Sequence, residues 1–197
     1  MIKEEINTLI RSRRAVFPQM YNQEKITDDE IRDILENSNW APTHKKTEPW
    51  RYIVFRGEAL TGLGEWLASR YREKATADGD YSDVKYEKFL NRPLQSGCVL
   101  GICMQRDPGK RLPKWEEIAA LACSVENMWL TCTAYGIGCY WSTPGFVVDA
   151  KDFPFLPDGW KCKGLFYMGR WDKRDLPSSR GPVGDKVIWA GDATTQG

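Results

Sequence analysis

A short polar segment, residues 41–50 (APTHKKTEPW), concentrates groups that donate hydrogen bonds or carry charge. It contains His44, the only histidine of the chain, then Lys45 and Lys46, and it ends in Pro49-Trp50. These donors lie on a short connection between a predicted helix and a predicted strand, which restricts the positions they can take. A solvated basic turn would have the same composition. Because loops carry function more often than cores do, the segment is the first candidate for a binding site.

The second candidate is a cluster of arginines near the N-terminus. Arg13 lies four residues after Leu9 and three after Ile10, so on a helix it continues their apolar face. A guanidinium turned inward needs an anion or a dense set of acceptors, and phosphate matches its planar fork of donors. Two other interpretations stay open: Arg13 extends past the helix end to solvent, or it pairs with a carboxylate. Arg11 and Arg14 flank it.

The third candidate is the segment YGIGCYWST, residues 135–143, in which two glycines end a helix and a strand follows. Trp141, Ser142 and Thr143 then stand where that strand ends. The segment is not a dinucleotide-binding fingerprint, because the third glycine is missing and the helix precedes the strand. The chain also has no GxxxxGK[ST] and no GxSxG motif, so neither a P-loop nor a serine nucleophile is indicated.

Hydrophobic periodicity predicts the elements that position these residues. A capping box of Thr27 and Glu30 starts the second helix, and Pro42 stops it. The mixture lacks regular βαβ alternation, which favours an α+β fold over a doubly wound sheet. The predicted helices are 2–16, 27–41, 58–74, 84–91 and 114–136, the predicted strands are 51–56, 97–105, 138–142 and 160–169, and 75–83 is a predicted loop.

Composition limits the class of protein. The 197 residues suit one domain, and 28 Lys plus Arg against 27 Asp plus Glu remove the usual electrostatic argument for a nucleic-acid partner. No apolar run approaches the ~18 residues of a membrane helix, and no signal peptide is indicated, so we expect a cytoplasmic protein. Six cysteines without a CxxC pair, beside a single histidine, predict buried free thiols and no metal site.

Two features point toward an interface. The chain has nine tryptophans, which serve either an aromatic core or a ligand or subunit interface. The predicted helix 114–136 is apolar or small almost all round beyond its first turn, which predicts burial on every side. In a chain this small, such a helix belongs either to a deep core or to a dimer contact.

Taken in order, these pieces strongly resemble the nitroreductase family of FMN enzymes. Arg13-Arg14-Ala15 resembles the family's Arg-Arg-Ser motif, and Ala41 through Trp50 resembles its Ala-Pro…Pro-Trp loop. Gly136 through Trp141 resembles its Gly-x-Gly-x-x-Trp segment, and Arg180 with the following VGDKVIW resembles its closing motif. The resemblance covers nearly the whole chain, and it is closest to small members that carry histidine in the loop.

The resemblance implies a single nitroreductase-like domain, residues 1–197, with a central, mostly antiparallel sheet flanked by helices. It implies a homodimer with two FMN molecules at the interface and a C-terminal arm, 170–197, that reaches the partner subunit. Ala15 replaces the usual serine, and Lys46 stands where many members have asparagine. The implied cofactor contacts are Arg13, Arg14, Ala15 and Arg180 at the phosphate end, Trp40, Pro42, Thr43, His44 and Lys46 in the loop, and Trp141, Ser142 and Thr143 beside the ring.

The implied activity is hydride transfer from NADH or NADPH to FMN, then reduction of a nitroaromatic, a quinone or a similar small-molecule acceptor by a ping-pong mechanism. The chemistry would occur at the flavin, so no catalytic side chain is expected. A flavin reductase, a specialised FMN dehydrogenase and a non-catalytic flavin-binding redox module are the alternatives. A basic module for phosphate-rich partners is disfavoured by the net charge of +1.

Overall fold

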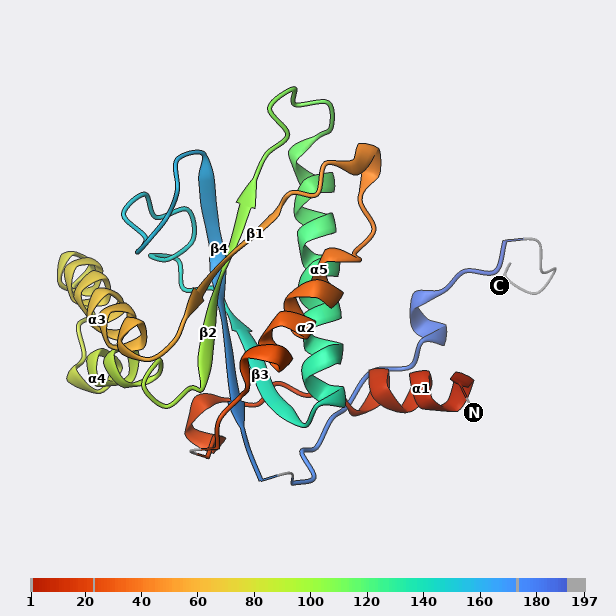
Figure 1. Cartoon of the computed structure of the whole chain (residues 1–197), viewed down its shortest axis with the longest axis horizontal. Coiled ribbons are helices and arrows are strands. Elements are labelled where there is room, and N and C mark those ends of the chain that lie inside the picture. The colour runs from red at the N-terminus through yellow and green to blue at the C-terminus, as the bar shows by residue number, and fades with distance from the viewer. Residues whose placement is uncertain (1, 23, 173, 191–197) are drawn as a thin grey trace.

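The computed structural model describes residues 2–22, 24–172 and 174–190, and within them the chain forms an α+β fold (Figure 1). The helices are α1 (Ile2–Ser12), α2 (Asp28–Asn39), α3 (Glu58–Asp78), α4 (Asp83–Asn91) and α5 (Lys114–Ala134). The strands are β1 (Trp50–Phe55), β2 (Cys98–Gln105), β3 (Ile137–Ser142) and β4 (Trp160–Arg170). Three short 3-10 turns are η1 (Pro18–Met20), η2 (His44–Lys46) and η3 (Gly184–Lys186).

The strands form one antiparallel sheet in the order β1-β2-β4-β3, so β1 and β3 are its edges. β2 and β4 lie in the centre and are buried on both faces, which explains why β2 is apolar throughout. α2 and α5 pack on one face, whereas α3, with α4 against it, packs on the other (Figure 1). The predicted α+β class and antiparallel sheet are confirmed.

Two helix boundaries differ from the prediction by more than two residues. The first helix ends at Ser12 instead of residue 16, because the backbone N–H of Val16 donates instead to the carbonyl of Cys139 on β3, at 3.0 Å. Residues 13–17 therefore belong to no helix or strand, and the prediction that Arg13 stands on a helix face is wrong. The predicted loop 75–83 is also partly wrong: α3 continues to Asp78 and ends at Gly79, whose left-handed backbone suits glycine.

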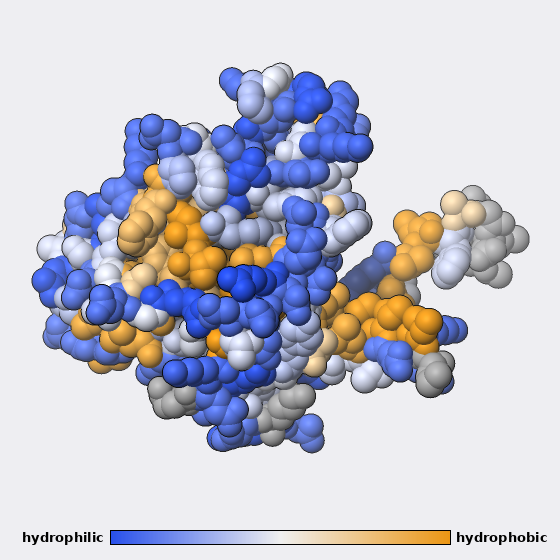
Figure 2. Space-filling model, in the orientation of Figure 1, coloured by the Kyte–Doolittle hydropathy of each residue, from blue (hydrophilic) through white to orange (hydrophobic). Residues whose placement is uncertain are grey.

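Both ends of the chain carry exposed apolar side chains. α1 buries none of its residues, and Ile2, Ile6 and Ile10 are at least half exposed. The segment around η3 exposes Ile188 and Trp189. Figures 1 and 2 show α1 and this segment projecting from one side of the molecule, with apolar surface on both. Clustered apolar side chains of this kind are typical of an interaction surface.

α5 packs against α2 and against the sheet. One stripe along α5 is nevertheless exposed. Trp115 is 68% exposed and Ile118 is 41% exposed, and the stripe continues through Ala119, Ala122 and Cys123 at helical spacing. The predicted burial on every side is therefore not achieved within a single chain. The small residues at the middle of the stripe would let another helix approach closely.

Candidate functional site

The free edge of β3 is the centre of the candidate site. Val16 covers this edge at Cys139, whose carbonyl accepts the backbone N–H of Val16 at 3.0 Å. Residues of a strand alternate the direction of their backbone N–H and C=O groups, so Trp141 is the next residue that presents them outward. Ser142 and Thr143 follow, half-buried and exposed respectively. The edge thus offers backbone donors and acceptors two residues beyond the point that Val16 covers, which is roughly 6.6 Å at 3.3 Å per residue.

Four predicted site residues meet in one hollow of about 590 Å³ beside this edge: Arg13, Arg14, Ala15 and Arg180. The side chain of Arg13 is 20% exposed, and its guanidinium lies 4.6 Å from the centroid of the Trp129 ring. Its Nε is 3.6 Å from a carboxylate oxygen of Glu126. A carboxylate partner was one of the interpretations left open by the sequence. The pair is long and half-exposed, so it leaves most of the guanidinium donors for an anion.

The three arginines have different roles. Arg14 donates to the backbone carbonyls of Leu176 (2.9 Å), Arg11 (2.8 Å) and Arg13 (3.0 Å), so it ties the C-terminal segment to the end of α1. Arg180 donates to the carbonyl of Ser179 at 2.8 Å through one nitrogen and is exposed. The free donors that face the hollow therefore belong mainly to Arg13 and Arg180. Two guanidinium groups with free N–H donors are suited to binding a phosphate.

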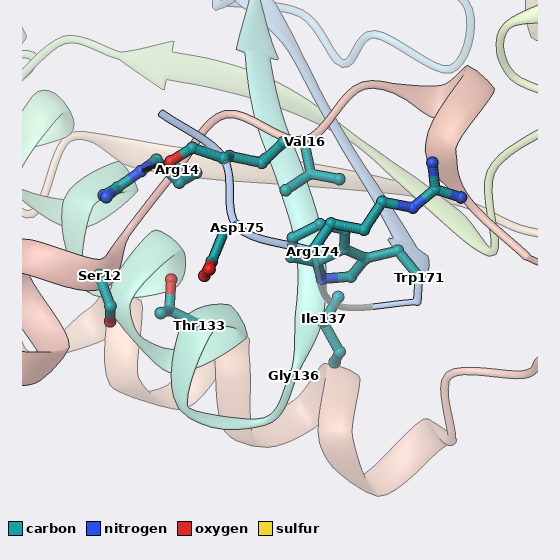
Figure 3. A pocket seen from close by; sticks show the side chains of 10 residues that line it. Ser12, Arg14, Val16, Thr133, Gly136, Ile137, Trp171, Arg174 and Asp175 are labelled. Carbon is teal, nitrogen blue, oxygen red and sulfur yellow. Dashed lines mark hydrogen bonds between the residues drawn. The ribbon is translucent and has the colours of Figure 1, made fainter. Parts of the chain in front are cut away.

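A second hollow, of about 480 Å³, lies on the other side of Arg14 (Figure 3). Ser12 and Thr133 project toward it from α1 and α5, and Asp175 enters it from the C-terminal segment. Trp171 and Arg174 stand on its opposite side, with the guanidinium of Arg174 turned away. None of these residues was singled out from the sequence, because the hollow is made by segments that are distant along the chain.

The loop from Trp40 to Thr47 lies at the other end of α5. His44 Nδ1 is 2.8 Å from a carboxylate oxygen of Glu116, in the first turn of α5. The hydroxyls of Thr43 and Thr47 are 3.1 Å apart, and the Thr43 hydroxyl accepts the backbone N–H of Glu48 at 3.2 Å. Trp40 is 78% exposed, although its indole N–H donates to Glu36. The loop is thus firmly held while Trp40 and Lys46 face outward.

The structure does not bring this loop and the arginine hollow together in one chain. His44 contacts α5 at residue 116, whereas Arg13 contacts it at residue 126. Ten helical residues correspond to about 15 Å. Pro42, Thr43, His44 and Lys46 therefore form one group, and Arg13, Arg14, Ala15 and Arg180 form another.

Two buried polar atoms near the open half of β3 lack hydrogen-bond partners among the described residues: the indole Nε1 of Trp141 and the hydroxyl of Tyr140. Burial raises the pKa of Tyr140, so its phenol stays protonated and able to donate at neutral pH. Gly164 of β4 lies directly against this segment, because a Cβ there would fall 2.6 Å from both the Ser142 carbonyl oxygen and Trp141 Nε1. The sequence analysis did not single out Gly164, although a glycine inside a predicted strand is a signal that could have indicated such a close approach.

A comparison with protein-family models decides the family. The model described as "Nitroreductase family" matches residues 10–170. The chain belongs to the nitroreductase family. Its predicted resemblance is confirmed, and the two groups of predicted site residues, together with residues 136–141, lie within the matched range; only Arg180 lies beyond it.

Relatives and solved structures agree with the nitroreductase family. The chain is 26% identical over 183 residues to Bacillus subtilis YfhC, a protein provisionally named as an NAD(P)H nitroreductase, with 92% of each chain covered. A nitroreductase-like family protein from Bacillus cereus superimposes with a TM-score of 0.77 at 23% identity, covering 95% and 96% of the two chains. The FMN-dependent nitroreductase NfnB from Mycobacterium smegmatis, solved in complex with NADPH, also gives 0.77, at 16% identity and 96% and 100% coverage.

Two further observations concern the described ranges of this nitroreductase-family chain. No helix there has both the length and the apolar character to cross a membrane. Nor do three or more His, Cys, Asp or Glu side chains gather there as a possible metal site.

Proposed function

We propose that the protein is an FMN-dependent oxidoreductase that takes hydride from NADH or NADPH and reduces a nitroaromatic, a quinone or a similar small molecule. Family membership supports this proposal, as do the names of its relatives: YfhC as an NAD(P)H nitroreductase and NfnB as an FMN-dependent enzyme crystallised with NADPH. A nitroreductase from Bacteroides fragilis, with a TM-score of 0.68 and 20% identity, has bound FMN.

The residues of the hollow fit FMN. Arg13 and Arg180 present free guanidinium donors for a phosphate, and Trp129 and Phe17 line the same hollow with aromatic surface. The open half of β3 begins beyond the point that Val16 covers, so the ring system would lie along this edge while the phosphate stays at the arginines. There the outward backbone groups of Trp141 would meet the polar edge of the ring. This combination, an anion cradle beside an open strand edge, is the observation that carries the proposal.

Once bound, the flavin would supply the hydride and electron transfer. The protein would hold its phosphate through Arg13 and Arg180 and orient the ring through the backbone of Trp141, with Ser142 and Thr143 beside it. Trp129 would exclude water from the tail of the cofactor. The chain has no separate nucleotide-binding motif, so the donor and the acceptor would use the same exposed face of the ring in turn, as in a ping-pong mechanism.

We further propose that the site is completed by a second copy of the chain. An antiparallel crossing of two α5 helices along the exposed stripe would place residue 116 of one chain near residue 126 of the other. His44 and Lys46 of the partner subunit would then face Arg13, and a cation there would favour the anionic reduced flavin. Three of the nine tryptophans, Trp40, Trp115 and Trp189, are more than two-thirds exposed in the single chain and would be covered.

Arg13→Ala tests the proposal. Loss of hydrogen bonds to a charged group costs about 1.5–3 kcal/mol each, so this variant should lose most of its flavin on dialysis while keeping its circular dichroism spectrum. Flavin absorbance per chain is the measurement. Arg11→Ala, two residues earlier on the exposed side of α1, is the matched control and should retain its flavin. Wild-type occupancy in Arg13→Ala would refute the assignment of Arg13.

A further inference from the structure

The pairing of β2 with β4 is interrupted by one extra residue. Ile102 pairs with Gly164, but the next pair is Cys103 with Cys162, so Lys163 is a β-bulge. Because side chains alternate between the two faces of a strand, one inserted residue reverses the face of the residues beyond it. The bulge therefore turns Cys162 to the same face as Cys103. Both side chains are fully buried in the layer covered by α3 and by the loop between β3 and β4.

The register places the two thiols opposite each other on neighbouring strands. A hydrogen bond from Cys103 lowers the pKa of Cys162, while that bond and burial raise the pKa of Cys103. Opposed residues of an antiparallel pair have Cβ atoms about 4.5–5.5 Å apart, and a disulfide needs about 3.5–4.5 Å. Bond formation therefore requires only a small adjustment of two strands that are already paired.

The other four cysteines lack this combination. Cys123 is exposed and stands alone on α5. Cys132 and Cys139 are neighbours, but Cys132 lies on helix α5 and Cys139 on strand β3, so they are not register partners of one strand pair. The Cys132 thiol is 3.7 Å from the sulfur of Met168. Burial raises the pKa of Cys139 strongly, which disfavours its reactive thiolate. Cys98 is buried and its pKa is raised to about 12.

We propose that Cys103 and Cys162 form a peroxide-sensitive dithiol that closes to a cross-strand disulfide. The Cys162 thiolate attacks one peroxide oxygen, the O–O bond breaks, and the departing hydroxide takes up a proton to become water, which leaves a sulfenic acid. The sulfur of Cys103 then attacks that sulfenic sulfur, the S–O bond breaks, and the proton of Cys103 leaves with the oxygen as a second water. Two thiols and one hydrogen peroxide thus give one disulfide and two waters.

The bulge connects this pair to the candidate site. The Cys162 thiol donates to the carbonyl of Gly164 at 3.5 Å, and Gly164 lies against Trp141, Ser142 and Thr143. A disulfide removes that thiol hydrogen and shifts the bulge beneath the segment proposed to hold the flavin ring. This effect on flavin binding rests on the proposed function, whereas formation of the bond does not.

The test uses the full chain, reduced and then treated with hydrogen peroxide under native conditions. After denaturation, the free thiols should fall from six to four and return to six with dithiothreitol. Peptide mapping should find one linked pair of peptides that contain Cys103 and Cys162. Cys132→Ala is the matched control, because it removes another fully buried cysteine and should still lose two thiols.

In Cys103→Ser the disulfide should not form, and a sulfenic-acid probe should label Cys162 instead. The peptide map of the wild-type chain decides the question even if this variant does not fold. Oxidation only at Cys123, or a link between Cys132 and Cys139, would overturn the proposal. A disulfide that forms in a protein unable to bind flavin would support the dithiol and refute the proposed function, so the two can fail separately.

Discussion

Lys45, Lys46 and Glu48 adopt positive φ angles of 53°, 51° and 41°, a region that residues other than glycine rarely occupy. Strain of this kind persists only where the surroundings enforce it, and here the hydrogen bonds of Thr43 and His44 do so. The strained backbone lowers the local stability of the loop, but it fixes the direction in which the basic side chains point. This agrees with the proposal that Lys46 faces a ligand.

Lys45→Gly should stabilise the protein relative to Lys45→Ala. The left-handed conformation costs a side-chain-bearing residue about 1–2 kcal/mol, and glycine loses about 0.4–1 kcal/mol through its freer unfolded state. The net gain in the free energy of unfolding should be roughly 0.5–1 kcal/mol, measured by chemical denaturation. The alanine variant controls for loss of the Lys45 contact with the Arg111 carbonyl. A glycine variant less stable than the alanine variant would show that the loop is not strained there.

At the scale of elements, the sequence located the strands well because their signals are local. The continuous apolar run of β2 and the capping box of Thr27 and Glu30 are both present in the structure. The end of α1 could not be predicted, because the chain turns away from the helical path where Val16 bonds to Cys139, more than a hundred residues away in the sequence. The position of the β-bulge at Lys163 could not be predicted either: Gly164 indicates an irregular strand, but the extra residue depends on the register between two strands.

The candidate site shows the same limit. Residue types and motifs indicated Arg13 and Arg180, but not that Glu126 and Trp129 of α5 would flank Arg13. Those contacts depend on how α5 lies against the end of α1, which no local pattern contains. The sequence also could not show that the guanidinium of Arg14 would donate its hydrogen bonds to backbone carbonyls.

The loop with His44 is positioned on α5 through Glu116, and this contact can be tested. His44→Ala should weaken flavin binding about 2- to 12-fold, corresponding to a net hydrogen bond of 0.5–1.5 kcal/mol, while the flavin-loaded variant still turns over. Equilibrium titration with FMN and steady-state rates at saturating FMN are the measurements. Glu116→Gln keeps an acceptor for the histidine and should stay near wild type. Complete loss of turnover with flavin bound would instead make His44 a participant in the chemistry.

At the scale of the whole molecule, the uncovered surfaces are consistent with one assembly. The apolar side chains exposed on α1, on the α5 stripe and on the segment around η3 form the kind of surface that marks interaction sites. The two groups of site residues, separated by about 15 Å along α5, would meet only across a two-fold axis near the middle of that helix. Arg180 would join them from a C-terminal arm whose apolar end requires a partner surface. Flavin binding and dimerisation should therefore be coupled.

A chain that ends at Leu176 tests this coupling, because it lacks Arg180 and the exposed Val187, Ile188 and Trp189 but keeps the Leu176 carbonyl that Arg14 binds. It should bind flavin more weakly and shift toward monomer in sedimentation, and both defects should worsen on dilution because subunits and cofactor stabilise each other. A chain that ends at Ala190 keeps these residues and should behave as wild type. Arg180→Ala in the full chain separates the two effects, since it should lower flavin affinity while leaving the apolar arm, and hence the dimer, in place at high protein concentration. If the chain that ends at Leu176 stays a flavin-loaded dimer at every concentration, the arm has neither role, and the dimer must be held by α5 and α1 alone.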